Sequence, residues 1–255
     1  VSEIKRYLST KKAVDNHNLS TKPVEPYVGV IHRLDKPVSG VMVYAKTKNA
    51  AASLSKQVAE GKMHKKYLAV LCGKPVDNVE KYVDYLLKDE KENTSRIVDM
   101  GIKGGKRAEL ICRALETKPV EPYGELTLAE IELLTGRHHQ IRVQMSGHGL
   151  PLWGDNRYNP AFQKGDAAMS GSAAERAAET GGQEQMEKKK RESGRILLRE
   201  RRRSGTGRSG RALRVDVALA AYELAFTHPE TGESMIFQHN PSGGIFRQFQ
   251  MPGQQ

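Results

Sequence analysis

The feature that most constrains how this chain can fold is a series of short apolar runs separated by charged or glycine-containing turns. Runs of four to eight residues that are rich in β-branched and aromatic side chains are typical of β-strands. They lie at 27–34, 41–46, 66–72, 80–87, 107–115, 125–133, 219–227 and 235–238. The last two are joined by the turn-forming residues 228–233 and therefore predict a hairpin.

Only two segments show a clear helical pattern. One covers 48–60, where Thr47 is placed to cap the first turn. The other contains Ile141 and Met145, which are four residues apart and can face the core together, while Arg142 is rotated off that face. Many short strands with few helices favour an α+β domain built around a mixed, largely antiparallel sheet with flanking helices.

The composition changes at residue 161. Between 161 and 213, Gly, Ala, Ser, Glu, Lys and Arg dominate, with almost no aromatic or β-branched residue. Such a segment buries too little apolar surface to offset the entropy of ordering it. Because strand-like sequence resumes at 219, we interpret 161–213 as a low-complexity charged insertion within one domain, 27–255. Residues 1–26 form a polar N-terminal segment whose start at Val rather than Met is typical of a truncated chain.

The chain carries a net charge of +11, from 41 Lys and Arg against 30 Asp and Glu. An excess of this size suits a polyanionic partner, most simply nucleic acid. Much of it is local, however, because 164–214 holds 14 basic and 7 acidic residues, a net +7 that leaves only +4 for the remainder. The overall charge is therefore a weak indication of what the folded part binds.

Two further observations bear on the compartment. No apolar stretch approaches the roughly 18 residues of a membrane-spanning helix, and the N-terminus does not resemble a signal peptide. The two cysteines, Cys72 and Cys112, lie in apolar runs, as expected of buried free thiols in a reducing compartment. We therefore expect a cytoplasmic protein without a membrane partner.

Residues 28–40, VGVIHRLDKPVSG, place charged side chains where one predicted strand ends and the next begins. Charges at strand ends line clefts more often than cores, since burying an unpaired charge is costly. Taken alone, an aspartate in such a turn is more often a turn-former or a helix cap. The loop is thus a candidate site that needs further support.

That support comes from three blocks that resemble, in the same order, the signature blocks of the RluA-type pseudouridine synthases. Residues 32–40, HRLDKPVSG, are similar to the active-site loop of that family, and 65–70, KKYLAV, to its tyrosine block. Residues 135–142, TGRHHQIR, continuing to 149–155, are similar to its arginine block. Residues 227–233, THPETGE, fit its closing hairpin. One block could arise by chance, whereas three in order are a specific signal.

The resemblance implies the pseudouridine synthase fold with a central cleft, and it assigns three catalytic residues. Asp35 would be the nucleophile that attacks the sugar or the uracil ring. Arg142 would keep that carboxylate ionised and fixed in the cleft. Tyr67 would stack against the uracil, and its hydroxyl would remove the C5 proton.

The resemblance also implies contacts with RNA. Arg33 adjoins Asp35 and would help to extrude the target base and fill its place. The other residues predicted to contact RNA are His32, Arg137, His139 and Gln140. As metal ligands, the histidines at 32, 138 and 139 lack a third partner at recognisable spacing, so we expect no metal and no organic cofactor.

The sequence thus predicts an isomerase for RNA modification, a monomer that converts a uridine to pseudouridine. The prediction favours ribosomal RNA over transfer RNA as the substrate. Two alternatives stay open beside a synthase directed to transfer RNA. The first is a noncatalytic RNA-binding protein that retains the fold. The second is a ribosome-assembly factor, an interpretation that rests only on the charge.

The composition of the insertion generates a prediction. Replacing about residues 165–210 by a short linker should leave a protein that unfolds cooperatively, because surface loops tolerate changes of length. Urea denaturation followed by circular dichroism measures this directly. Loss of the cooperative transition would show that the segment packs, and a smaller salt dependence of RNA affinity would show that it contacts phosphates.

Overall fold

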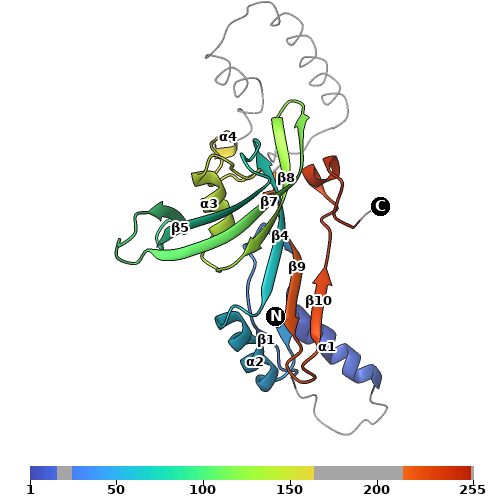
Figure 1. Ribbon diagram of the computed structural model, residues 1–255. Helices are drawn as coiled ribbons and strands as arrows, with labels where there is room; N and C mark the ends of the chain where they lie inside the picture. The colour runs from blue at the N-terminus through green and yellow to red at the C-terminus, as the bar shows by residue number, and fades with distance from the viewer. Residues whose placement is uncertain (16–24, 164–214, 254–255) are drawn as a thin grey trace, which may run out of the picture. The chain divides into compact units, whose positions relative to one another are not determined.

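The computed structural model describes residues 1–15, 25–163 and 215–253 (Figure 1). Nearly all of the predicted insertion, 161–213, lies outside these residues. The chain divides into two compact units, Val1–Asn159 with Asp216–Gln255, and Pro160–Val215. Of the second unit, the structure describes only the short helix α4 (Pro160–Gln163) and Val215. The remainder of this section concerns the first unit.

The first unit is built on an eight-stranded sheet. Seven strands follow the order β10-β9-β4-β8-β7-β5-β6, and the eighth, β2, lies off this path and pairs with β9. The β2–β9 pairing is parallel and all the others are antiparallel. The strands are β2 (Ser39–Gly40), β4 (His64–Cys72), β5 (Val79–Asp89), β6 (Thr94–Val98), β7 (Lys106–Val120), β8 (Gly124–Leu133), β9 (Leu219–Thr227) and β10 (Ser234–Gln238). The predicted α+β class with a mixed, largely antiparallel sheet is confirmed.

The five long predicted strands and the closing hairpin are present, β9 at its predicted bounds and the others with shifted boundaries. The largest shift is in β7, which runs to Val120 because Glu116 to Val120 continue to pair with β8 beyond an irregularity at Ala114. Strand β6 was not predicted, because its five residues carry little apolar pattern. Only pairing with β5 makes it a strand.

The expectation of full strands at 27–34 and 41–46 is wrong. Each contributes only two residues to a separate two-stranded sheet, β1 (Gly29–Val30) and β3 (Tyr44–Ala45). Because this small sheet lies outside the main one, Tyr27 and Val30 stay partly exposed instead of entering a core. The residues between β1 and β3 are thereby free to form the loop that carries Asp35.

Both predicted helices are present. In α2 (Lys48–Ala59), the Ala50 amide donates to the Thr47 hydroxyl at 3.1 Å, which confirms the cap. Helix α3 spans Gln140–Gly147. Besides the short α4, the other helices of the described residues are α1 (Ser2–Asp15) and a 3-10 helix at Gly244–Gln248. No helix within the described ranges is long and apolar enough to span a membrane.

The core is centred on β4, whose residues Leu68 to Leu71 are fully buried on both faces of the sheet. Ile141 and Met145 of α3 join the same apolar cluster, as their spacing predicts. Leu34 and Val38 pack against it from the loop after β1. The two apolar residues that flank Asp35 therefore anchor its loop to the main core.

Gly40 fixes the other end of this loop. It adopts φ +125°, and a Cβ at this position would collide with the carbonyl oxygen of Ala221 on β9. The next residue, Val41, donates its amide hydrogen to that same oxygen at 2.9 Å. A glycine is required here because the backbone of β2 and the backbone of β9 approach each other directly.

We predict that Gly40→Ala lowers the free energy of unfolding by about 2–5 kcal/mol, the combined cost of backbone strain and overpacking. Gly61→Ala is the matched control, since Gly61 has φ +69° but faces open space. That control should cost only about 1 kcal/mol, for backbone strain. Urea denaturation of both variants tests this, and equal losses would contradict the proposed close approach.

Candidate active site

The loop after β1 brings Asp35 to the first turn of α3. The Asp35 Oδ2 atom lies 3.7 Å from Arg142 Nη1 and 3.7 Å from His139 Nε2. The amide of Val38 donates to the Asp35 carbonyl at 2.8 Å, which closes the turn beneath the carboxylate. The Asp35 side chain is 30% exposed, whereas that of Arg142 is 5% exposed. The predicted proximity of Asp35 and Arg142 is confirmed.

The guanidinium of Arg142 makes its two short bonds with Asp155 rather than with Asp35. Nε donates to Oδ2 and Nη2 to Oδ1 of Asp155, each at 2.7 Å. The expectation that Arg142 is rotated off the core face holds only in part, because its side chain is buried against the turn 155–158. With two nitrogens engaged by Asp155, the third, Nη1, faces Asp35.

Both members of this buried pair are held in their charged forms. Burial alone raises the pKa of Asp155, but bonds from Arg142 and from the amides of Arg157 and Tyr158 outweigh it and lower the pKa. Burial alone lowers the pKa of Arg142, and the carboxylates of Asp155 and Asp35 outweigh it and raise the pKa. The result is a fixed cation beside Asp35.

Asp155 is positioned by the end of β4. The Cys72 amide donates to the Pro151 carbonyl at 2.8 Å, and the Trp153 amide donates to the Val70 carbonyl at 2.9 Å. The segment 150–155 therefore runs along the central strand and delivers Asp155 beneath α3. Asp155 belongs to the block 149–155 that resembles the family's arginine block, but the sequence alone gave it no role. No local pattern shows which cation such a carboxylate contacts.

Tyr67 lies on β4 in the same apolar cluster that receives Leu34 and Val38. Burial, followed by the charge of Asp35, raises the pKa of Tyr67 to about 12. Its hydroxyl is therefore protonated at neutral pH. The structure thus brings together all three residues that were predicted to be catalytic.

The two residues that begin the loop differ in exposure. Burial, and then the charge of Lys65, lower the pKa of His32, whose Nε2 accepts the Val43 amide hydrogen at 3.3 Å. His32 Nδ1 is buried without a hydrogen-bond partner in the described part of the chain. Arg33 is exposed. Arg33 is accordingly the residue of this pair whose side chain is open to solvent.

The residues predicted to contact RNA at the beginning of α3 also differ in exposure. Gln140 is buried, and its Oε1 accepts from the Thr135 hydroxyl at 2.8 Å and from the Arg137 amide at 2.9 Å. His139 is buried as well, facing Asp35. Arg137 is exposed, and its Nε donates to the Arg107 carbonyl at 2.9 Å. Gln140 and His139 thus shape the site from within, and Arg137 lies at its surface.

No group of three or more His, Cys, Asp or Glu within the described ranges is arranged to hold a metal ion. Cys72 and Cys112 are free cysteines, and burial raises their pKa values to about 11 and about 12. Both thiols are therefore protonated at neutral pH and are poor nucleophiles.

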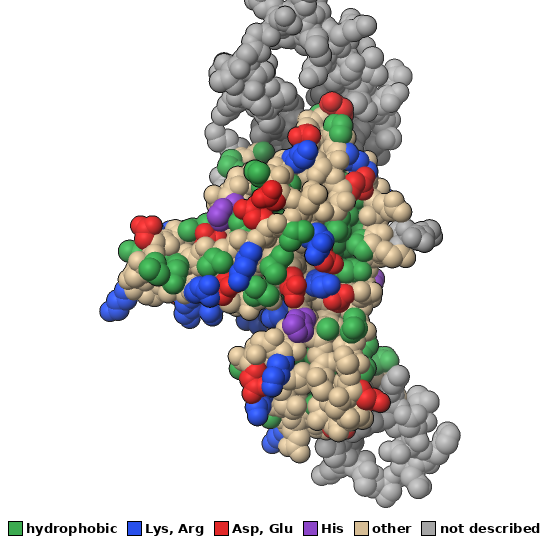
Figure 2. All heavy atoms as spheres, in the orientation of Figure 1, with side chains coloured by type: hydrophobic (Ala, Val, Ile, Leu, Met, Phe, Trp, Pro, Cys, Tyr) green, Lys and Arg blue, Asp and Glu red, His purple; other side chains and the backbone are tan. Residues whose placement is uncertain are grey.

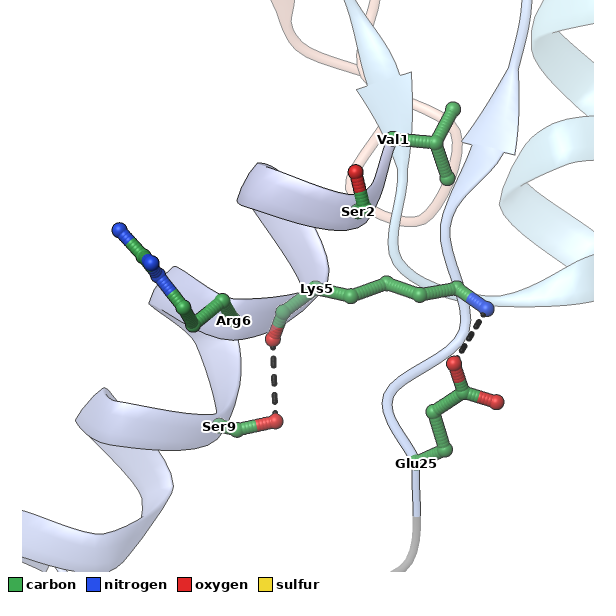
Figure 3. Close-up of a pocket in the computed structure, with 6 residues that line it drawn as sticks. All are labelled: Val1, Ser2, Lys5, Arg6, Ser9 and Glu25. Atoms are coloured by element: carbon green, nitrogen blue, oxygen red, sulfur yellow. Dashed lines mark hydrogen bonds and ion pairs between the residues drawn. The ribbon is translucent and has the colours of Figure 1, made fainter.

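A hollow of about 470 Å³ lies beside α1 (Figure 3), and none of the predicted site residues lines it. Among its lining residues, Lys5 donates to Glu25 at 2.8 Å, and the Ser9 hydroxyl donates to the Lys5 carbonyl at 3.0 Å. It is lined by Val1, Ser2, Lys5, Arg6, Ser9 and Glu25. None of these side chains forms a nucleophile–base pair, and we assign the hollow no part in the chemistry.

On the face that Figure 2 shows, Lys and Arg side chains are interspersed with Asp and Glu. Several strand residues are paired accordingly. Lys66 lies 3.8 Å from Glu130 and 3.3 Å from Glu223, and Lys81 lies 2.8 Å from Glu109. This mixing agrees with the modest net charge outside 164–214.

Comparisons with known proteins agree with the geometry. The family described as RNA pseudouridylate synthase matches residues 3–147. Ribosomal large subunit pseudouridine synthase D of Zymomonas mobilis is 33% identical over 150 residues, which is 59% of this chain and 45% of that protein. Ribosomal large subunit pseudouridine synthase C of Escherichia coli K12 is 30% identical over 226 residues, which is 89% of this chain and 56% of that protein.

Solved structures show the same fold. Human RNA pseudouridylate synthase domain containing 1 aligns with a TM-score of 0.56 and 22% identity, over 84% of this chain and 69% of that one. Human RNA pseudouridylate synthase domain containing 4 aligns with a TM-score of 0.57 and 18% identity, over 94% of this chain and 78% of that one. The chain belongs to the RNA pseudouridylate synthase family, and it spans about half the length of the curated relatives it matches.

The buried pair makes stability depend on pH. Because the pKa of Asp155 is lower in the folded protein, its contribution is fully present above the unfolded pKa of about 3.9 and is lost as pH falls through the folded pKa. We predict that Asp155→Asn costs about 3–5 kcal/mol at pH 7, because it leaves Arg142 buried without its main partner. The loss should shrink as pH falls below about 4, because the unfolded wild-type chain then binds a proton at Asp155 that the folded protein does not, and it should vanish below the lower folded pKa.

Urea denaturation at pH 7 and at pH 3 measures both effects. Asp99→Asn is the matched control, since Asp99 is exposed, and it should change stability by less than about 0.5 kcal/mol. A loss for Asp155→Asn no larger than that of Asp99→Asn would contradict the structural role of the pair.

Proposed function

We propose that this protein is an RNA pseudouridine synthase that isomerises a uridine in ribosomal RNA with Asp35 as the nucleophile. The observation that carries this proposal is the placement of Asp35 Oδ2 at 3.7 Å from a buried guanidinium whose other nitrogens are fixed by Asp155. Family membership supports the reaction class, and the names of the two bacterial relatives support ribosomal RNA as the substrate.

The reaction is an isomerisation and needs no oxidant or reductant. The N1–C1′ bond of uridine breaks, the base turns, and a C5–C1′ bond forms. The base loses the proton from C5 and gains one at N1, so that atoms and charge balance. Asp35 would attack either the sugar or the uracil ring and leave again when the new bond has formed.

The electrostatics of the site suit this role. A carboxylate nucleophile must be ionised and held in place, and a neighbouring guanidinium favours both conditions. Oδ2 of Asp35 faces Arg142 and His139. Oδ1 makes no hydrogen bond or ion pair with any described residue, which leaves it available to the substrate.

Tyr67 is better suited to stacking against the uracil than to acting as a base that is already deprotonated. With its pKa raised to about 12, its hydroxyl keeps its proton at neutral pH. To remove the C5 proton, the hydroxyl must pass its own proton to an acceptor. The nearby acceptor whose charge raises the Tyr67 pKa is Asp35, which becomes free again after its bond to the substrate breaks.

We assign the contacts with RNA to the exposed cations at the site. Arg33 adjoins the nucleophile and is placed to occupy the gap left by an extruded base. Arg137 is placed to bind a neighbouring phosphate. The alternative, a noncatalytic RNA-binding protein, gives no reason for burying a bidentate Arg142–Asp155 pair directly beside a third charged group.

The test is to map pseudouridine in total RNA with and without this gene, and to assay the purified protein on ribosomal and transfer RNA. We predict that Asp35→Asn lowers turnover by more than about 10³-fold while RNA affinity changes little, because the amide keeps the shape but is not a nucleophile. Asp99→Asn serves as the matched control and should retain full activity. Pseudouridine formation by Asp35→Asn at a near wild-type rate would overturn the proposal.

A further inference from the structure

The Tyr158 hydroxyl links β6 to the beginning of α3. It accepts the Ser95 backbone amide hydrogen at 2.9 Å and lies 2.7 Å from His139 Nδ1. The Tyr158 ring meets the His139 ring edge-on at 5.6 Å, and the Arg142 guanidinium lies 5.1 Å from the centre of the same ring. One tyrosine therefore contacts both residues that face Asp35.

These contacts determine where the hydrogens lie. A backbone N–H only donates, so the Tyr158 hydroxyl is the acceptor of the Ser95 bond. The hydroxyl must then direct its own hydrogen to its other partner, His139 Nδ1, since no other acceptor contacts it among the described residues. A neutral imidazole that accepts at Nδ1 carries its hydrogen on Nε2. Nε2 is the atom that faces Asp35 Oδ2 at 3.7 Å.

Burial, reinforced by neighbouring basic groups, keeps His139 neutral. Burial is the main reason that its pKa is lowered to about 4, and Asp35 opposes this shift. Arg142, His138 and Arg157 lower the pKa further, and the His138 ring is stacked on that of His139 at 3.7 Å. At neutral pH His139 is thus an uncharged donor.

The backbone of His139 is also under constraint. It adopts φ +53° directly before α3, a left-handed conformation that is uncommon for residues other than glycine. It makes no side-chain capping bond to the helix that would account for this conformation. Its ring instead lies between Tyr158 and Asp35. Strain of this kind persists where the surrounding structure holds a residue in place, often at functional sites.

We propose that Tyr158 fixes His139 as its Nε2–H tautomer and that His139 in this form is a positioning residue, which donates to Oδ2 of Asp35 when substrate is bound. The inference rests on the nucleophilic role proposed for Asp35. At 3.7 Å the contact is longer than a hydrogen bond, and such bonds commonly tighten in the substrate complex. A neutral donor orients the carboxylate without the further loss of nucleophilicity that a second full cation would cause.

The tautomer is measured by ¹⁵N NMR of the full chain with labelled histidines, where the His139 signals are assigned from a His139 variant. We expect the wild-type protein to show His139 as the Nε2–H tautomer between pH 6 and pH 8. In Tyr158→Phe the preference should be lost or reversed, and kcat should fall roughly tenfold or more with KM within about twofold. Tyr82→Phe removes a hydroxyl whose one partner among the described residues is Glu80, so it should leave both tautomer and kcat unchanged.

A double-mutant cycle separates positioning from general loss of packing. His139→Gln keeps an N–H donor at the position of Nε2 but has no tautomer for Tyr158 to select. In that background, Tyr158→Phe should change kcat by less than about twofold. An equal kcat loss from Tyr158→Phe in both backgrounds would show a merely structural role and would overturn the proposal.

If the Tyr158→Phe variant does not fold, the wild-type NMR measurement alone still tests the tautomer and charge state assigned to His139. Finding His139 as the Nδ1–H tautomer, or as a cation at pH 7, would overturn the inference. These readouts do not depend on the reaction. Activity retained by Asp35→Asn would remove the proposed nucleophile, whereas the tautomer result would still stand or fall on its own.

Discussion

The structure of the site depends on the buried bond between Arg142 and Asp155. Removing two charges from water is costly, and the cost is offset only if geometry is good and the remaining bonding positions are filled. Here both conditions hold, since two 2.7 Å bonds join the pair and two backbone amides donate to the same carboxylate. A pair of this kind contributes little net stability compared with apolar packing. What it provides is a guanidinium with a fixed orientation, one nitrogen of which faces Asp35.

The main sheet holds the remaining parts of the site through backbone contacts. The segment before Asp155 is bonded to β4, the loop that carries Asp35 is bonded to β9 at Val41, and Gly147 lets α3 approach Ile97 of β6 closely. Strands β4 and β9 are neighbours in the interior of the sheet, whereas β6 is its last strand. The charged groups therefore converge from segments that are distant in the sequence, while their supports belong to one rigid element. Such support is what the nucleophilic role proposed for Asp35 requires, since a nucleophile must be held within a fraction of an ångström.

The distribution of charge agrees with the proposal that RNA is bound locally at the site. Within the described strands, many lysines and arginines are paired with carboxylates, as Lys66 and Lys81 show. Arg33 and Arg137, by contrast, present exposed guanidinium groups next to the site. Affinity for the phosphate backbone would then come from a few cations around the site and not from a uniformly basic surface.

The sequence by itself determined the strands β4, β5 and β7 to β10, the Thr47 cap and the α+β class. These features follow from periodicity and local motifs, which record whether a residue is buried and how the chain turns. The grouping of Asp35, Tyr67 and Arg142 was implied instead by the resemblance of three ordered blocks to a known family. Only the tertiary structure decided that Arg142 is bonded to Asp155, that β6 exists and supplies Ser95 to Tyr158, and that 27–46 forms a loop with three two-residue strands. The physical reason is that the partner of a polar group is chosen by three-dimensional proximity. Spacing along a chain shows that a carboxylate must find a donor, but it does not show which one.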